Sequence, residues 1–243
     1  MGNNMLSLTP VVKHLMIING LVFLGCISLK QSGIDLFDHF AIYPLSSDLF
    51  KPFQFLTHLF MHSTRDFTHI FSNMFMLFIL GSYLERYWGS KNFLIYYLAT
   101  GLGAACLHLF VIEYEISQTL SLLTNEEINL VFDKGYEISM EGKRFIDPKL
   151  ETLNDLLHTP TVGASGAVFG ALIAFGMLFP NMVFYFYFLF PIKAKYFVLL
   201  YGIFELWSGF SNRAGDNVAH FAHLGGMLFG FLIIKYWKKK GHS

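Results

Sequence analysis

The sequence predicts an all-α membrane protein with six spanning helices, and three observations favour this fold class. Of the 243 residues, 54% are hydrophobic and only 14% are charged, whereas soluble domains carry roughly 25% charged residues. The mean hydropathy is positive, at +0.48. Six windows of about 20 mostly apolar residues, the length that a helix needs to cross a bilayer, follow one another at 12–29, 67–87, 93–112, 161–180, 195–210 and 218–237.

The charge balance, the aromatic content and the cysteines exclude several other classes of protein. The chain has 17 Lys and Arg against 17 Asp and Glu, and 18% of its residues are aromatic. A disordered chain, a collagen-like repeat and a basic nucleic-acid-binding protein all have different compositions. Cys26 and Cys106 lie inside apolar stretches and are interpreted as small packing residues. We therefore expect a protein that lies in the lipid bilayer and binds no nucleic acid.

The six windows differ in how strongly they predict a spanning helix. The first follows an N-terminal segment that lacks the basic start and the cleavage site of a secretory signal, so we expect it to remain as an anchor. The fifth is the weakest, because it is short and contains Glu205. It also follows the aromatic run 184–188, which could lie at the membrane interface instead.

The loops between the windows predict an orientation and an insertion. With both termini on one side, the short loops there hold nine Lys and Arg in 47 residues, and the opposite segments hold eight in 92. Basic residues accumulate on the cytoplasmic side of membrane proteins, so we expect cytoplasmic termini. Segment 113–160 holds ten acidic and four basic residues. We expect it to be a polar insertion outside the bilayer, within a single membrane domain at 1–243.

The fourth window begins with a serine among small residues, in the run Gly163-Ala164-Ser165-Gly166. The run is close to G-x-S-x-G, but no strand precedes it, so the α/β-hydrolase interpretation lacks its structural context. Taken alone, Ser165 is as well explained as a small residue at a helix contact.

The sixth window contains two histidines, His220 and His223, in an apolar helix. Ionisable groups at membrane depth are costly and indicate function. Glycines spaced four apart occur here, at Gly226 and Gly230, and in the fourth window, at Gly166 and Gly170. Such pairs let two helix backbones approach closely. We expect this approach to bring Ser165 within hydrogen-bond reach of His223, as a nucleophile and its general base require.

Helix geometry separates the two histidines. At about 100° per residue, His223 lies roughly 60° from Gly226 and roughly 20° from Gly230, on the face of the glycines. By the same arithmetic, His220 lies roughly 120° and 80° away. We therefore expect His223 to be the base, and His220 to hydrogen-bond a loop or to contact the oxyanion region.

A third group of polar residues opens the second window: His58, His62, His69 and Asn73. His69 and Asn73 are four apart, hence on one helix face, and both can donate hydrogen bonds to an oxyanion. His58 and His62 have the same spacing, but no H-E-x-x-H motif and no obvious carboxylate ligand accompany them. We therefore expect no metal, and interpret these two histidines as hydrogen-bonded to loop backbone.

Together these motifs resemble one family. The combination of Gly163-Ala164-Ser165-Gly166, Ala222-His223-Leu224-Gly225-Gly226, His69-x-x-x-Asn73 and Glu85-Arg86-x-x-Gly89, over six windows, is similar to the rhomboid intramembrane serine proteases, and the match covers roughly 50–112 and 160–237. The resemblance implies a six-helix bundle and a Ser165/His223 dyad without a third acid. It also implies an oxyanion hole formed by the Ser165 N–H, Asn73 and His69, with His220 beside it and Gly163, Gly166, Gly226 and Gly230 supporting it.

The chain departs from the family pattern at four places. Phe169 stands where a tyrosine often stacks on the catalytic histidine. The gap from His62 to His69 is two residues longer than usual, the first extramembrane loop has no Trp-Arg pair, and Glu205 has no family role. None of these departures removes a catalytic residue.

The expected function is hydrolysis of transmembrane or juxtamembrane segments of single-span membrane proteins, without a cofactor, in a bacterial inner membrane. A catalytically inactive relative that binds or escorts membrane proteins is the alternative. A transporter that uses His220, His223 and Glu205 as a proton path is a third class. A serine-directed probe separates the enzyme from both rivals, because only the enzyme should label at Ser165.

Overall fold

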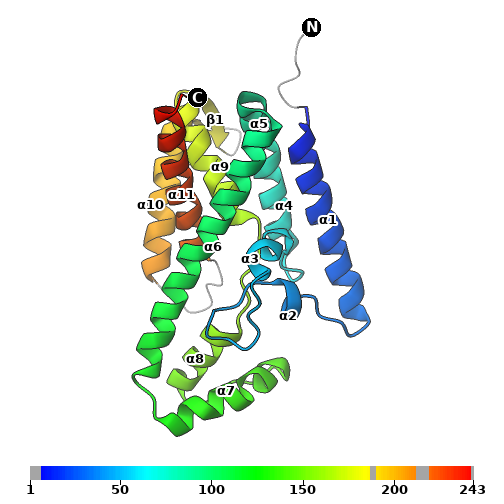
Figure 1. The fold of residues 1–243 in the computed structure, drawn as a ribbon, viewed down its shortest axis with the longest axis vertical. Coiled ribbons are helices and arrows are strands. Elements are labelled where there is room, and N and C mark those ends of the chain that lie inside the picture. Colours follow the sequence, from blue (N-terminus) through cyan, green and yellow to red (C-terminus); the bar gives the residue numbers. More distant parts are fainter. Residues whose placement is uncertain (1–6, 187–189, 212–218, 242–243) are drawn as a thin grey trace.

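A computed structural model describes residues 7–186, 190–211 and 219–241, most of them helical (Figure 1). Each of the six apolar windows contains a helix, although residues 161–164 and 179–180 of the fourth window lie outside its helix and Val218, the start of the sixth window, lies outside the described residues. Three described helices are long and apolar enough to cross a membrane: Pro10–Gln31, Phe67–Trp88 and Ser90–Leu120. The predicted membrane class is therefore supported, while the count of six spans is not confirmed.

The centre of the bundle is α9 (Ser165–Leu178), an apolar helix of 14 residues. Ten of its residues are buried, because its small side chains let the neighbouring helices approach from several sides. It lies between α6 (Ser90–Leu120) and α11 (His220–Lys239), and α10 (Ala194–Ser211) packs beside α9 and α11 (Figure 1).

The second window forms one continuous helix of three parts: α4 (Phe67–Met76), the π-helical turn η2 (Leu77–Gly81) and α5 (Ser82–Trp88). The Asp66 carboxylate caps its start by accepting a hydrogen bond from the Thr68 N–H, at 2.8 Å. The helix ends at Gly89, which has φ +79°, a conformation that favours glycine.

The Glu85-Arg86 pair connects this helix to the start of α1 (Pro10–Gln31). The Glu85 carboxylate accepts hydrogen bonds from the N–H groups of Val11 and Val12, at 2.9 and 3.0 Å, and from the Thr9 hydroxyl. These N–H groups have no partner inside the helix, so Glu85 acts as the cap of α1. Arg86 donates to the Ser7 carbonyl.

The predicted insertion at 113–160 begins within a helix. α6 continues without a break to Leu120, so residues 113–120 prolong the helix of the third window. The rest forms α7 (Asn125–Met140) and α8 (Pro148–His158), which lie at the end of the molecule opposite the start of α1 and the end of α11 (Figure 1). Their contact buries a small apolar cluster of Ile116, Val131, Leu150, Leu153 and Leu157.

The segment between α1 and α4 contains three short helices, α2 (Phe37–Phe40), α3 (Gln54–Thr57) and the 3₁₀ turn η1 (His58–Phe60). It contacts the α7–α8 unit, since the Tyr136 hydroxyl donates to the Asp38 carboxylate at 2.8 Å. It also forms a two-residue bridge between Ile42 and Thr161, just before α9.

A small hairpin departs from the all-α prediction. Strands β1 (Val183–Phe186) and β2 (Phe190–Lys193) pair antiparallel between α9 and α10. Much of the aromatic run 184–188 thus forms a strand, as its aromatic composition favours. Tyr187 and Phe188 lie outside the described residues.

Candidate active site

Ser165 is the first residue of α9, and a tight loop precedes it. In this loop Gly163 has φ +125°, a backbone conformation that side chains rarely adopt. A Cβ at Gly163 would lie 3.0 Å from Nε2 of His69, and the Gly163 N–H donates to the His58 carbonyl at 2.9 Å. The glycine therefore lets the loop lie directly against the His69 ring.

The glycines of α9 and α11 bring the two backbones into contact. A Cβ added at Gly226 would lie 1.9 Å from the carbonyl oxygen of Gly166, and one added at Gly230 would lie 3.2 Å from the Cα of Gly170. The close approach expected of the two glycine pairs is present. Because Ser165 precedes Gly166 directly, this contact holds the start of α9 against α11.

The His223 ring has a fixed orientation. It stacks on the ring of Phe169, with ring centroids 4.0 Å apart and planes 6° from parallel. The aromatic stacking expected at Phe169 is therefore confirmed, without the hydroxyl of a tyrosine. Phe169 follows Ser165 by four residues, so the two lie on one face of α9, one turn apart. His223 thus packs one helical turn from Ser165.

His69 and Asn73 lie on α4, facing the same region. The Ser63 N–H points to Nδ1 of His69 at 3.4 Å, which leaves the ring proton on Nε2, the nitrogen beside Gly163. Asn73 is buried and donates one of its two amide hydrogens to the His69 carbonyl, at 2.8 Å.

His220 has Glu205 as its partner, a residue that the sequence analysis grouped with it only in the transporter alternative. Its Nδ1 donates to Oε2 of Glu205 on α10, at 2.6 Å, and the same oxygen lies 3.0 Å from Nδ1 of His223. The prediction offered a loop or the oxyanion region as the partner of His220, whereas this hydrogen bond joins α11 to α10. The signal for Glu205 was present in the sequence, because a carboxylate in an apolar helix requires a polar partner.

Comparison with known proteins identifies the family. A model of a protein family, described as "Rhomboid domain", matches residues 50–240 of this chain. The chain belongs to the rhomboid family.

Two curated relatives extend the comparison. This rhomboid chain is 29% identical to "RHOMBOID-like protein 12, mitochondrial" of Arabidopsis thaliana over 163 residues, which is 66% of this chain and 40% of the relative. It is 36% identical to an uncharacterized mitochondrial rhomboid protein of Schizosaccharomyces pombe over 88 residues, which is 34% of this chain and 22% of the relative. The chain thus spans less than half the length of these two relatives.

The two histidines before α4, His58 and His62, differ in their partners. His58 Nδ1 donates to the Gln54 carbonyl at 2.8 Å, as expected of a histidine bonded to backbone. His62 is fully buried, with its ring centroid 5.2 Å from that of His69, but neither of its ring nitrogens has a hydrogen-bond partner among the described residues, so the backbone bond expected of it is not found. In the described ranges, the group of side chains with converging ligand atoms is Glu205, His220 and His223, whose atoms lie within 4.8 Å of one another.

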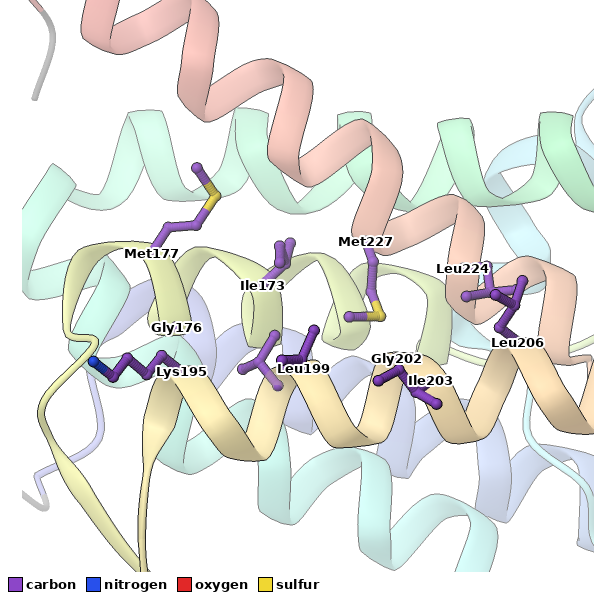
Figure 2. A pocket seen from close by; sticks show the side chains of 11 residues that line it. Ile173, Gly176, Met177, Lys195, Leu199, Gly202, Ile203, Leu206, Leu224 and Met227 are labelled. Carbon is purple, nitrogen blue, oxygen red and sulfur yellow. The ribbon is translucent and has the colours of Figure 1, made fainter.

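A separate apolar pocket of about 470 Å³ lies between α9, α10 and α11 (Figure 2). Ile173, Leu199 and Met227 line its middle, and Lys195 lies at one end. None of the predicted site residues lines it. The pocket reflects looser packing of α10 than of α11 against α9, and the polar groups described above lie outside it.

Proposed function

We propose that this rhomboid is an intramembrane serine endopeptidase with Ser165 as nucleophile and His223 as general base. One observation carries the proposal: His223 stacks on Phe169, one helical turn from Ser165, where the backbones of α9 and α11 touch. A nucleophile and a base on two different helices need such a rigid contact to stay within hydrogen-bond reach.

The proposed reaction follows from these roles. His223 takes the hydroxyl proton as Ser165 Oγ attacks the scissile carbonyl, and then gives it to the leaving amine when the C–N bond breaks. Water hydrolyses the resulting acyl-enzyme by the same proton transfers. Positioned acid–base transfer of this kind contributes roughly 10²–10⁴ in rate.

Three donors would stabilise the oxyanion. The Ser165 N–H lies in the first turn of α9, where backbone N–H groups have no partner inside the helix. Nε2–H of His69 lies against the loop before Ser165, and Asn73 offers its amide from the next turn of α4. Donors fixed in this way contribute to catalysis because they need no reorganisation during the reaction.

The proposed substrates are transmembrane or juxtamembrane segments of single-span membrane proteins. The carbonyls of a helical substrate are already hydrogen-bonded, so a short stretch must unwind before attack. Proline and glycine in the substrate weaken its helix and lower that cost. Hydrolysis also needs water, so the polar groups around Ser165 must open to an aqueous cavity.

The site begins at the helix ends that lie toward α7 and α8, opposite the start of α1 and the end of α11 (Figure 1). We propose that α7 and α8 lie outside the bilayer on this side, within one domain at 1–243, and that both termini are cytoplasmic. We propose a bacterial inner membrane as the location. A mitochondrial membrane is the alternative, favoured by the names of the two relatives.

A catalytically inactive membrane-protein escort is the second candidate, favoured by the name "rhomboid-like", which states no activity. The test uses the full chain in detergent with a single-span model substrate and a serine-directed phosphonate. Ser165→Ala should abolish cleavage and labelling without changing the fold, because alanine fills the same space. Ser82→Ala, at a buried serine on α5, is the matched control and should keep both activities. Cleavage by Ser165→Ala, or no activity in the wild type, would reject the protease assignment.

A further inference from the structure

Glu205 is a buried carboxylate in α10, whose other residues are largely apolar. Its side chain is only 3% exposed. Its neighbours in the chain, Phe204 and Leu206, are 55% and 47% exposed. Placing a carboxylate at membrane depth costs several kcal/mol unless polar groups surround it. The position of Glu205 is therefore explained only by the groups that it contacts.

Those groups are two imidazoles from the first turn of α11. Oε2 of Glu205 lies 2.6 Å from Nδ1 of His220 and 3.0 Å from Nδ1 of His223. α11 starts close to α10, since a Cβ added at Gly209, one turn further along α10, would lie 3.4 Å from Cβ of His220. Figure 2 shows the residues that follow Glu205 and His223, Leu206 and Leu224, side by side where α10 meets α11.

The orientation of the His223 ring decides which of its two nitrogens faces Glu205. Stacking on Phe169 fixes the plane of the ring. With Nδ1 turned to Glu205, Nε2 lies on the far side of the ring and is left for another partner. Ser165 lies one turn from Phe169 on the same face of α9. The arrangement is that of a nucleophile, a base and a carboxylate in series.

We propose that Glu205 is a positioning residue for His223, so that the site works as a Ser165–His223–Glu205 series rather than as a dyad. The proposal rests on the proposed protease function. Glu205 holds the proton of the resting ring on Nδ1 and leaves the lone pair of Nε2 for Ser165.

The proton balance gives Glu205 a role without making it a proton acceptor. The hydroxyl proton of Ser165 moves to Nε2 of His223 as the Oγ–C bond forms. It moves on to the leaving nitrogen as the C–N bond breaks. The Nδ1 proton stays on the ring throughout, and Glu205 stays ionised. Its negative charge stabilises the imidazolium that exists between the two transfers.

His220 anchors the carboxylate in this arrangement. Its hydrogen bond to Oε2 has good geometry. Among the described residues, none makes such a bond to Nδ1 of His223, although Oε2 is only 3.0 Å away. A small rotation of the ring or of the carboxylate aligns that N–H. His220 therefore fixes Glu205, and Glu205 orients His223.

A metal ion is the rival explanation of this group, since two histidines and a glutamate form a common zinc donor set. Tetrahedral zinc with bonds of about 2.0–2.1 Å holds its donor atoms roughly 3.4 Å apart. The Glu205 and His220 atoms are 2.6 Å apart, which is a direct hydrogen bond. The geometry therefore favours a hydrogen-bonded group.

The test compares Glu205→Gln with the wild type in the full chain in detergent. Measured are kcat and KM on a single-span model substrate and the rate of phosphonate labelling at Ser165. We expect kcat and labelling to fall roughly 10²–10⁴-fold, as when the acid of a serine triad is replaced by its amide, with KM changed less than about threefold. Glu205→Asp, which keeps the charge on a shorter chain, should recover part of the loss.

The matched control is Glu85→Gln, the other buried glutamate that several hydrogen bonds surround. This change should lower the melting temperature but leave labelling per folded molecule unchanged. If Glu205→Gln also lowers the melting temperature but leaves labelling per folded molecule unchanged, Glu205 has a purely structural role and the proposal is overturned. Loss of wild-type activity on adding a chelator, with recovery on adding zinc, would overturn it in favour of a metal.

A measurement on the wild type keeps the proposal testable if Glu205→Gln does not fold. Nitrogen-15 spectra of labelled histidine report which ring nitrogen carries the proton. We expect His223 to carry it on Nδ1, and a proton on Nε2 would overturn the proposal. Failure of the protease function has a different signature, because the wild type itself would then neither cleave nor label.

Discussion

A glycine lies at the contact of α9 with α11, and another lies at the contact of α7 with α8. The first glycine lies against a helix backbone, whereas the second lies against a side chain. At Gly226 the space is filled by the backbone carbonyl of Gly166, 1.9 Å from an added Cβ. At Gly135 on α7 it is filled by the side chain of Asn154, whose Oδ1 lies 2.2 Å from an added Cβ. A side chain can rotate away from a new methyl group, whereas a helix backbone cannot.

The two regions also treat polar groups differently. In the bundle, Glu205 and Glu85 are buried among polar partners. Glu205 accepts a hydrogen bond from His220 and lies 3.0 Å from Nδ1 of His223, and Glu85 accepts hydrogen bonds from the N–H groups of Val11 and Val12. In the α7–α8 unit the ion pair Lys134–Glu137 is exposed, with both side chains more than half accessible, and such pairs contribute little to stability. The proposed catalytic groups therefore lie where packing fixes them, and we expect the α7–α8 unit to tolerate change better.

The largest expected effect is that of Gly226→Ala. The new methyl group meets backbone atoms, so we expect the free energy of unfolding to fall by about 3 kcal/mol or more and cleavage to be lost. Thermal unfolding and a cleavage assay measure both effects. Gly25→Ala on α1, where an added Cβ meets nothing within 4 Å, is the control and should change neither. Equal behaviour of the two variants would show that the backbone contact is not needed.

Asn73→Ala should have a smaller effect confined to turnover. Loss of one oxyanion donor among three should lower kcat by roughly 10²–10³-fold, and the phosphonate should still label Ser165 slowly. The hydrogen bond from Asn73 to the His69 carbonyl lies within one helix, so the fold should persist. Wild-type turnover in this variant would make Asn73 a structural residue only.

Replacement of Glu115–Leu156 by a short Gly/Ser linker should change activity less than about tenfold. This segment contributes none of the proposed site residues, and its apolar cluster is separate from that of the bundle. The same model-substrate assay measures the result. A folded but inactive variant would assign the α7–α8 unit to the site or to its access path.

The smallest effect is a pH dependence of the α7–α8 unit. Burial lowers the pKa of His158, on α8, below its ordinary value of 6.5. The unfolded segment then binds a proton more readily than the folded one. The free energy of unfolding of the α7–α8 unit is therefore highest above pH 6.5, and it decreases as the pH falls from 6.5 through the lowered pKa of His158. The hydrogen-exchange protection factors of α7 and α8, which are corrected for the pH dependence of intrinsic exchange, should fall as the pH is lowered below about 6.5. His158→Gln should remove this change, and an unchanged pH response would assign it to another group.

Sequence reasoning predicted the membrane class, the helical segments and the residue types of the site, because each depends on local pattern. Apolar length predicts a spanning helix, glycine spacing predicts a close helix contact, and a histidine in an apolar helix indicates function. The hairpin between α9 and α10 and the continuation of α6 to Leu120 were not predicted, because aromatic runs and polar helix ends give no unambiguous local signal.

By itself, then, the sequence determined the rhomboid family, the chemical groups available and the face of α11 that carries His223. The tertiary structure alone decided what those groups touch. Glu205 is separated from His220 by 15 positions and from His223 by 18, and no periodicity within one helix relates residues on α10 to residues on α11. Its contact with both imidazoles depends on how the two helices pack, and that packing is set by side chains and glycines spread over the whole bundle.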